Sequence, residues 1–243
     1  MSVERSGRRC RGTAFSSDAD GERLTVSEPT LERESALRSL GHRLVAGVDE
    51  VGRGSVAGPV VAAACVLPPE VRGISGVLDS KALTRGQRLR LADEIRRCSI
   101  ACAIGAASRR EVDHLNVRAA SALAMRRALA RLPAWDHALY DGLMARELDP
   151  ELTTAVVHGD ALSLSIACAS ILAKVTRDAL MGRLAARHPE YGWDHNAGYG
   201  TEEHLAALRA HGVTPHHRLT FAPVRDLLGP SRTTPDASAV GDA

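Results

Sequence analysis

The sequence is poor in aromatic residues and has no long apolar run. Phe, Trp and Tyr make up 3% of its 243 residues, so any core must be built from Ala, Val, Leu and Ile. No apolar stretch approaches the roughly 20 residues that a membrane-spanning helix needs. The first 24 residues begin with basic side chains but lack the apolar stretch of a signal peptide. We therefore expect a soluble, cytoplasmic protein.

Lysine is also nearly absent. Only two of the 31 basic residues, Lys81 and Lys174, are lysines, although lysine is normally among the commonest residues. Either these two survive by chance, or they lie where a compact ammonium group is preferred to a planar guanidinium group. The formal net charge of +2 does not by itself require a nucleic-acid partner.

The five cysteines form no CxxC pair, and their number is odd. Both facts argue against a zinc site or a disulfide framework. All except Cys10 lie in apolar surroundings, so we interpret them as small buried hydrophobic residues.

Hydrophobic patterning predicts one α/β domain with a mixed sheet over residues 41–228. We expect residues 1–40 to be a disordered extension in which 31–40 could form a short helix. Residues 229–243 read as a flexible tail. Deleting residues 1–38 is therefore expected to leave activity nearly unchanged.

Within the domain, both strands and helices are signalled locally. Thr84 with Gln87, and Ser108 with Glu111, are typical of capping boxes that open helices. Strands are expected at 44–48, 56–67, 99–107, 137–140 and 155–157. Further helices are expected at 116–132, at 163–187 and between Thr201 and Gly212.

Three predicted strands end at acidic residues beside a glycine: Asp49-Glu50, Asp141 and Asp160. Strand ends are the usual sites of chemistry in α/β sheets. If these ends converge, four carboxylates share one pocket and repel one another unless a cation neutralises them. Oxygen ligands without Cys or His favour Mg²⁺ or Mn²⁺ over zinc. Two such ions support phosphodiester hydrolysis.

Each acidic residue also has a purely structural interpretation. Asp-Gly is a common turn dipeptide, which would explain Asp141. Asp160 could cap a helix, and Asp49-Glu50 could begin a solvated loop. Spacing alone does not decide between these interpretations.

Over residues 44–226 the chain resembles bacterial type 2 ribonucleases H. The matching segments follow the family's order: VAGVDEVGRGSVAGPVVAAACVL, VLDSKALT, EVDHLNVRAA, the DG pair at 141–142, VVHGD, SIACASILAKVTRD, YGWDHNAGYGT and HHRLTFAPV. The resemblance implies an RNase H-like fold, with a five-stranded mixed sheet flanked by helices and a C-terminal helical extension. It also implies an endonuclease that cuts 5′ of ribonucleotides, both in RNA–DNA hybrids and singly embedded in duplex DNA, leaving 3′-hydroxyl and 5′-phosphate ends.

The resemblance further implies particular residue roles. The catalytic residues, which are also the ligands of a two-metal site for Mg²⁺ or Mn²⁺, would be Asp49, Glu50, Asp141 and Asp160. Contacts to nucleic acid would come from Gly52, Arg53, Gly54, Ser80, Lys81 and Tyr199. Lys174 and Asp178, four residues apart on a helix, would pair behind the ligands.

Some features depart from the family or allow other interpretations. Cys168 stands where Ala is usual, and Leu143 where Asn is common. Gly52-Arg53-Gly54 could be a plain turn, and Tyr199 could merely fix its loop. His216-His217-Arg218 could be structural or could face a phosphate. The remaining histidines invite a metal interpretation that the oxygen-rich ligand set disfavours: His158, His195, His204 and His211.

Two other functions compete with this prediction. A resolvase- or transposase-type nuclease of the RNase H-like superfamily would share the acidic cluster but lack the GRG and DSK motifs. A non-enzymatic nucleic-acid binder would need a basic surface and no acidic residues at strand ends. The low net charge and the strand-end carboxylates both count against the binder.

Overall fold

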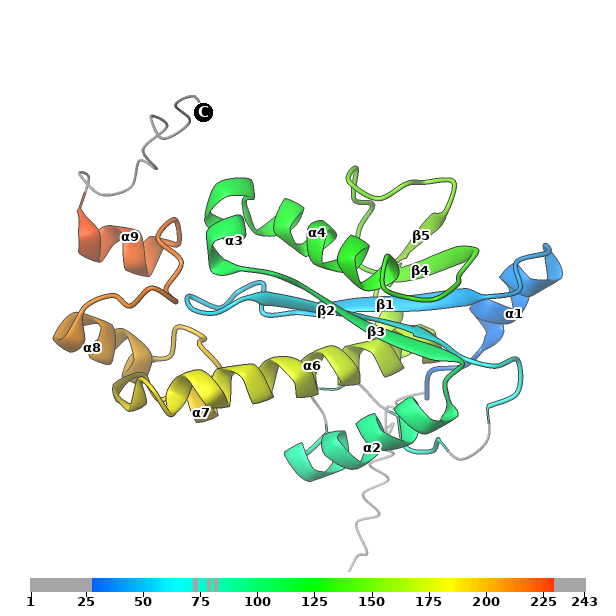
Figure 1. Ribbon diagram of the computed structural model, residues 1–243, viewed down its shortest axis with the longest axis horizontal. Coiled ribbons are helices and arrows are strands. Elements are labelled where there is room, and N and C mark those ends of the chain that lie inside the picture. Colours follow the sequence, from blue (N-terminus) through cyan, green and yellow to red (C-terminus); the bar gives the residue numbers. More distant parts are fainter. Residues whose placement is uncertain (1–27, 72–73, 78–79, 81–82, 230–243) are drawn as a thin grey trace, which may run out of the picture.

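The computed structural model describes residues 28–71, 74–77, 80 and 83–229 (Figure 1). Five strands form one sheet in the order β3-β2-β1-β4-β5. Strands β1, β2 and β3 are antiparallel neighbours, whereas β4 and β5 run parallel to β1, so the sheet is mixed as predicted. The strands are β1 (Val45–Val51), β2 (Val60–Val66), β3 (Ala101–Ala107), β4 (His137–Asp141) and β5 (Thr153–Val156).

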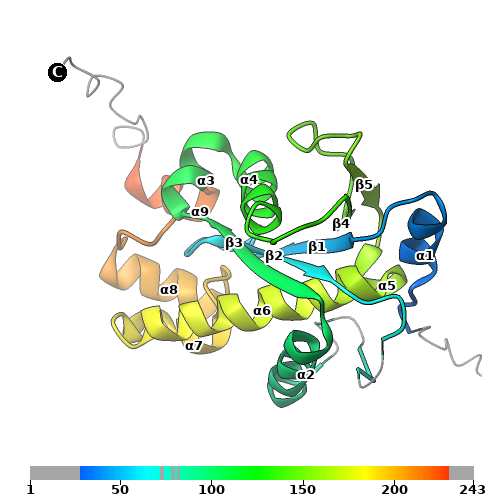
Figure 2. The same cartoon turned by 45° about the vertical axis from the view of Figure 1, so that its right-hand side comes forward.

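Helices cover both faces of the sheet and one end of it. Helix α4 lies on one face, and α6 with α2 on the other, while α7, α8 and α9 gather at one end (Figures 1 and 2). This end group is the predicted C-terminal helical extension. The helices are α1 (Glu32–Ser39), α2 (Arg85–Cys98), α3 (Arg109–Leu115), α4 (Val117–Leu129), α5 (Gly159–Leu162), α6 (Leu164–Ala185), η1 (Pro189–Tyr191), α7 (Trp193–Asn196), α8 (Glu202–His211) and α9 (Ala222–Leu228).

Strand β2 is buried along its whole length and serves two cores. Ala62 and Ala64 pack in the cluster beneath α4, and Ala63 and Cys65 pack in the cluster beneath α6 and α2. This alternation is the two-residue period of a strand. A β2 rich in alanine lets helices approach both faces closely, which is how a chain with few aromatic residues builds a dense core.

The start of helix α6 packs directly against Gly47 of β1. A Cβ atom there would lie 2.1 Å from the backbone carbon of Ser165, so no larger residue fits without separating α6 from the sheet. The glycine therefore sets the distance between α6 and the strand that carries the first two acidic residues.

The local helix signals are confirmed. Thr84 and Ser108 each form a complete capping box at the start of α2 and α3. Asn116 caps α4, since its side chain accepts hydrogen bonds from the backbone N–H groups of Arg118 and Ala119.

One predicted boundary was wrong. The strand predicted from Val56 begins at Val60, because the preceding residues pair instead with segments near Gly198 and His216. The long helix predicted over about 163–187 is confirmed as α6, with Ser163 as its N-cap. The short helix α5 before it and the helix α9 were not predicted as separate elements.

The domain boundary predicted at residue 40 also fails for residues 28–40. Glu34 on α1 is fully buried and accepts hydrogen bonds from Ser163 Oγ at 2.6 Å and from the backbone N–H of Ser165 at 2.9 Å. Both donors belong to the start of α6, so α1 is packed into the domain that contains the sheet. Residues 1–27 and 230–243, on which the rest of the extension and the tail were predicted, lie outside the described residues.

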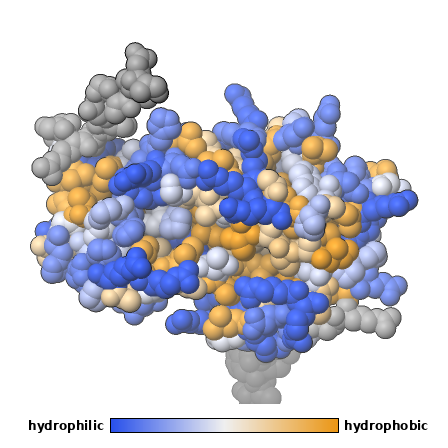
Figure 3. All heavy atoms as spheres, viewed as in Figure 1, coloured by the Kyte–Doolittle hydropathy of each residue, from blue (hydrophilic) through white to orange (hydrophobic). Residues whose placement is uncertain are grey.

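Strand β3 forms one edge of the sheet, and two arginine side chains bind its carbonyl groups. Arg127 donates to the carbonyl of Ala106 at 2.8 Å, and Arg131 donates to that of Ile104 at 2.6 Å. Figure 3 shows hydrophobic residues across the middle of this face, between more hydrophilic helices. Charged groups on an edge strand discourage pairing with another chain.

None of the helices in the described ranges is long and apolar enough to cross a membrane. The cysteines in these ranges are all free: Cys65 and Cys168 are buried, and Cys98 and Cys102 are half-buried. Cys10 lies outside the described residues.

We predict that Glu34→Ala destabilises the protein. The substitution leaves the buried donors of Ser163 and Ser165 without an acceptor, which costs about 1–3 kcal/mol and lowers Tm by several degrees in thermal unfolding. Glu34→Gln, which keeps an acceptor oxygen, should lose less, and Glu32→Ala on the exposed side of α1 should lose nothing measurable. Deleting residues 1–38 should destabilise like Glu34→Ala, whereas a deletion of 1–27 keeps every contact that Glu34 makes. A full-stability 1–38 deletion would contradict this role of α1.

Candidate active site

Adjacent strands carry three of the acidic residues. Asp49 and Glu50 lie in β1, and Asp141 is the last residue of β4. The two strands are parallel, with Val48 paired to Tyr140. Asp49 and Asp141 therefore occupy the next position on each of two neighbouring strands.

Helix α5 brings the fourth acidic residue to the same end of the sheet. The backbone N–H of Gly159 donates to Asp141 Oδ1 at 2.7 Å, and Asp160 is the next residue. Asp160 lies in the first turn of α5, directly after the residue whose backbone N–H meets Asp141.

Asp49 and Glu50 face opposite sides of the sheet. Their partners on β2 are Ala63, which packs toward α6, and Ala62, which packs toward α4. Asp49 accordingly accepts a hydrogen bond from Ser170 of α6. Glu50 lines a pocket beside α4.

The acidic residues interact strongly through their charges. Burial raises the pKa of Asp49 well above its ordinary value, the charges of Glu50 and Asp141 raise it further, and the Ser170 hydrogen bond opposes this. Burial also raises the pKa of Glu50, with Arg53 lowering it and Asp141 raising it. The Arg53 guanidinium lies 3.1 Å from Glu50 Oε1. Three carboxylates thus interact at a largely buried position.

These residues suit a hard divalent cation. Among the described residues, the buried Glu50 Oε2 has no hydrogen-bond partner. A bound cation would compensate for the cost of burying this oxygen. The ligand atoms are carboxylate oxygens, as Mg²⁺ and Mn²⁺ prefer. Among the described residues, no three His, Cys, Asp or Glu side chains stand together as a ready-made coordination shell.

A pocket of about 390 Å³ opens beside Glu50 and Asp141. Arg53 and Arg118 also line it, and they supply positive charge next to the carboxylates. Leu143, at the position noted as a departure, lies in this lining and is largely exposed. Arg118 was not singled out from the sequence, although it lies within the EVDHLNVRAA segment.

Two buried arginines hold the loop after β1. Arg218 donates to the carbonyls of Gly52 at 2.7 Å, Arg53 at 2.9 Å and Gly58 at 2.9 and 3.0 Å. Arg177 donates to three further carbonyls, those of Ala57, Pro59 and Ala197. Neither arginine was singled out as a site residue, because their partners are backbone atoms distant in sequence.

Tyr199 lies against the same loop. It forms an isolated β-bridge with Ser55, and a Cβ added at Gly54 would lie 3.8 Å from its Cε1 atom. The tyrosine is 38% exposed, and the Arg177 guanidinium lies 5.7 Å from the ring centroid. Arg53, Gly54 and Tyr199 are therefore exposed side by side on one surface.

Ser80 of the DSK motif (residues 79–81) is connected to Asp49 through Ser170. Its side chain is buried, and its Oγ lies 3.0 Å from Ser170 Oγ. Ser170 in turn hydrogen-bonds Asp49. The Ser80 hydroxyl thus faces inward and not toward a ligand. Lys81 lies outside the described residues.

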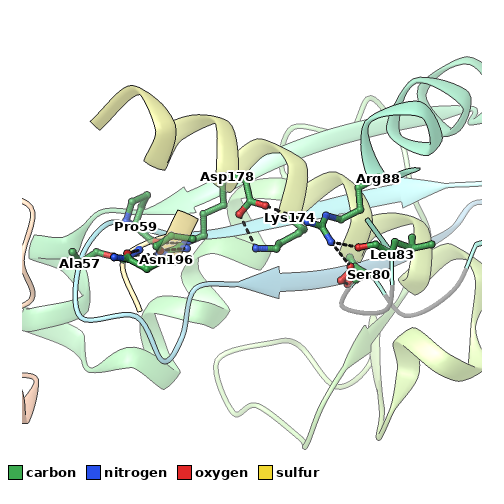
Figure 4. A network of polar contacts seen from close by, with 12 residues as sticks. Ala57, Pro59, Ser80, Leu83, Arg88, Lys174, Asp178 and Asn196 are labelled. Atoms are coloured by element: carbon green, nitrogen blue, oxygen red, sulfur yellow. Dashed lines mark hydrogen bonds and ion pairs between the residues drawn. The ribbon is translucent and has the colours of Figure 1, made fainter. Parts of the chain in front are cut away.

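The predicted pair Lys174–Asp178 is present on α6, with Lys174 Nζ 2.7 Å from Asp178 Oδ1 (Figure 4). Arg88 extends this network, since it lies 3.9 Å from Asp178 Oδ2 and donates to the Ser80 carbonyl at 2.9 Å. The network therefore joins α2, α6 and the DSK segment.

The C-terminal histidines are structural where they are buried. His217 and Arg218 are fully buried, so neither side chain faces a phosphate in this conformation. His204 is also buried and bonds His217. His195 is instead exposed and lies between the carboxylates of Asp194 and Glu203.

Known proteins resemble this chain in sequence and in fold. The family model described as Ribonuclease HII matches residues 46–224. Ribonuclease HII of Synechococcus sp. (strain JA-3-3Ab) is 52% identical over 204 residues, covering 83% of this chain and 92% of that protein. Ribonuclease HII of Ruegeria pomeroyi is 49% identical over 209 residues, covering 86% and 88%. The crystal structure of the ribonuclease H2 from Pyrococcus horikoshii OT3 has a TM-score of 0.63 and 27% identity, covering 76% of this chain and 96% of that one.

Two neighbouring glycines provide a matched test of the loop. Gly52 has φ +94°, and a Cβ there would lie 2.1 Å from Arg177 Nε. Gly52→Ala should therefore destabilise the protein by about 1–3 kcal/mol, seen as a lower Tm. A Cβ at Gly54 would meet only an ordinary van der Waals contact, 3.8 Å from Tyr199 Cε1, so Gly54→Ala should melt like the wild type. Equal losses in both variants would contradict the arginine-held geometry.

The raised pKa of Asp49 predicts how stability depends on pH without divalent ions. A carboxyl whose pKa is higher in the folded state stabilises the fold at low pH, and this contribution is lost as pH rises through the folded pKa. In EDTA, the Tm of Asp49→Asn minus that of the wild type should therefore increase as pH rises above the ordinary carboxyl range. Asp93→Asn, at a side chain that is 75% exposed, is the control. A constant difference for Asp49→Asn would show that the site is not strained by charge.

Proposed function

The chain belongs to the ribonuclease HII family, and on this premise we propose that it is a metal-dependent endonuclease acting on ribonucleotides within duplexes. Its substrates are RNA–DNA hybrids and single ribonucleotides embedded in DNA. It hydrolyses the phosphodiester on the 5′ side of the ribonucleotide and leaves 3′-hydroxyl and 5′-phosphate ends.

The observation that carries this proposal is the charge coupling of Asp49, Glu50 and Asp141 on two adjacent strands. With Asp160 at the start of α5, they would hold two Mg²⁺ or Mn²⁺ ions. Such a pair of ions activates the attacking water and stabilises the leaving oxygen. The protein's own part is to fix the carboxylates on rigid strands and to keep Glu50 Oε2 free of competing hydrogen bonds.

The GRG loop supplies recognition of the sugar. Its carbonyls are engaged by Arg218, and among the described residues the backbone N–H groups of Arg53 and Gly54 have no partner. These donors can meet a ribose 2′-hydroxyl and its phosphate, and the 2′-hydroxyl distinguishes RNA from DNA. Gly54 is exposed and has no side chain, which permits close approach of a sugar.

Tyr199 would read the position next to the ribonucleotide. Its half-exposed ring lies beside Gly54, so a sugar following the ribonucleotide can pack on it. A 2′-hydroxyl at that sugar would fit poorly, which favours an RNA-to-DNA junction. Lys81 would add a phosphate contact, and the Lys174–Asp178 pair would support the site from α6.

A non-enzymatic binding role fits the site less well. A ligand phosphate approaching Glu50 and Asp141 meets repulsion that only Arg53 and Arg118 offset within the pocket. A site built only for binding gains nothing from such carboxylates, whereas a site that uses cations requires them.

The test uses labelled duplex DNA with one embedded ribonucleotide and, in parallel, a continuous RNA–DNA hybrid. Both are incubated with Mg²⁺, with Mn²⁺ or with EDTA, and the product ends are mapped. We expect cleavage 5′ of the ribonucleotide only with a divalent ion. Asp141→Asn keeps an oxygen for the Gly159 N–H but loses its charge, and should lose roughly 100-fold or more in rate.

The matched control for that test is Asp93→Asn, which should cleave like the wild type. Near-wild-type cleavage by Asp141→Asn at saturating Mg²⁺, or undiminished cleavage in EDTA, would refute the metal-dependent mechanism. Products with other ends would refute the stated polarity.

A further inference from the structure

A chain of buried hydrogen bonds in the C-terminal helical extension ends at Tyr199. His204 on α8 and His217 in the following loop are fully buried, and their Nε2 atoms are 3.1 Å apart. Trp193 Nε1 donates to His204 Nε2 at 2.9 Å. The other nitrogen of this imidazole, Nδ1, lies 2.8 Å from the carbonyl oxygen of Tyr199.

The partners fix the tautomer of both rings. His217 Nδ1 accepts the backbone N–H of Thr214 at 2.9 Å, so its proton is on Nε2 and is donated to His204. His204 Nε2 accepts from both Trp193 and His217, so its proton is on Nδ1 and is donated to the Tyr199 carbonyl. Only neutral rings satisfy this pattern. Burial agrees with it, since it lowers the pKa of His204 and lowers that of His217 to about 3.

The chain of bonds also connects to the GRG side of the site. His217 forms an isolated β-bridge with Ala57, and the backbone N–H of Ala57 donates to the Gly198 carbonyl at 3.2 Å. The Tyr199 N–H donates to the Asn196 carbonyl at 2.9 Å. The Tyr199 carbonyl accepts the backbone N–H of Thr201 at 2.9 Å, and its side-chain donor is His204. The peptide groups on both sides of Tyr199 are therefore held.

We propose that His204 and His217 are positioning residues for Tyr199. The His217–His204 pair orients the carbonyl of Tyr199 and thereby holds its ring against Gly54, where it meets the sugar beyond the ribonucleotide. This inference rests on the proposed role of Tyr199, and it assigns to two histidines the specificity for a single embedded ribonucleotide over a continuous hybrid.

Two variants of His204 separate its two ring nitrogens. In His204→Asn the amide nitrogen takes the place of Nδ1, which keeps the donor to Tyr199 but leaves Trp193 and His217 without their acceptor. In His204→Gln the amide oxygen takes the place of Nε2, which keeps that acceptor but loses the donor. If only packing of the C-terminal helices mattered, Gln would be the milder change. If the hydrogen bond to the Tyr199 carbonyl matters, His204→Asn should change the substrate specificity less than His204→Gln does.

The measurement is kcat/KM on the single-ribonucleotide duplex divided by kcat/KM on the hybrid. Tyr199→Ala should lower this ratio roughly ten- to a hundredfold, the range of a stacked ring in nucleic-acid sites. His204→Gln should lower it by about tenfold, the value of one hydrogen bond, and His204→Asn should keep it within about threefold. In a Tyr199→Ala background, His204→Gln should change the ratio no further.

The outcomes separate this inference from the proposed function. A wild-type ratio in His204→Gln, alongside a lowered ratio in Tyr199→Ala, overturns the positioning role alone. Equal losses on both substrates in His204→Gln show a general folding role and also overturn it. A wild-type ratio in Tyr199→Ala overturns the proposed role of the tyrosine, and the positioning role with it.

A measurement without substitution covers the case in which His204→Gln does not fold. In ¹⁵N-histidine NMR of the whole protein, His204 should show its proton on Nδ1 and His217 on Nε2 at neutral pH. The opposite tautomer in His204 would exclude donation to Tyr199 and overturn the proposal. His217→Asn, which keeps the acceptor for Thr214, should lower the specificity ratio in the same direction as His204→Gln.

Discussion

The burial of two adjacent carboxylates in a central strand is the constraint on which the rest of the fold depends. Asp49 and Glu50 face opposite sides of β1, so each helical layer must accommodate one buried acid. The α6 side meets Asp49 with a serine hydroxyl, and the α4 side leaves a pocket at Glu50. Glu34 of α1 fixes the start of α6, and Gly47 allows that helix to reach the strand. The burial of these two carboxylates is unfavourable for folding, and the tight packing of α6 on β1 keeps them in place.

The loop after β1 is rigid for a different reason. A loop of glycines would ordinarily sample many conformations, but the carbonyls of Gly52, Arg53 and Gly58 are all bound by Arg218. A buried guanidinium without a carboxylate partner is costly unless its donors are satisfied, and these carbonyls satisfy four of them. Fixing the carbonyls also fixes the direction of the N–H groups, which leaves the loop's donors preset for a ligand.

The sequence predicted what depends on local patterns and missed what depends on long-range partners. The capping boxes at Thr84 and Ser108 were predictable because both partners lie within three residues. Asp49, Glu50 and Asp141 could be singled out because each lies at or near the end of an apolar run, a pattern that is visible locally. Glu34 and Arg218 were not, because a glutamate in a polar segment and an arginine in a C-terminal motif show no sign of burial until their backbone partners are placed. The inward direction of the Ser80 hydroxyl could not be predicted for the same reason, since it depends on Ser170.

The scarcity of lysine agrees with the kind of contact that the basic side chains make. Arg218 and Arg177 each bind several carbonyls at once, which requires the five donors and planar fork of a guanidinium. Arg127 likewise reaches both a β3 carbonyl and the Glu111 carboxylate. Lys174 makes a single short contact with Asp178, which a compact ammonium group can do while keeping a flexible stem. In a chain that builds its core from small residues, bridging distant backbone segments falls to long side chains, and arginine is the one that can bind several at once.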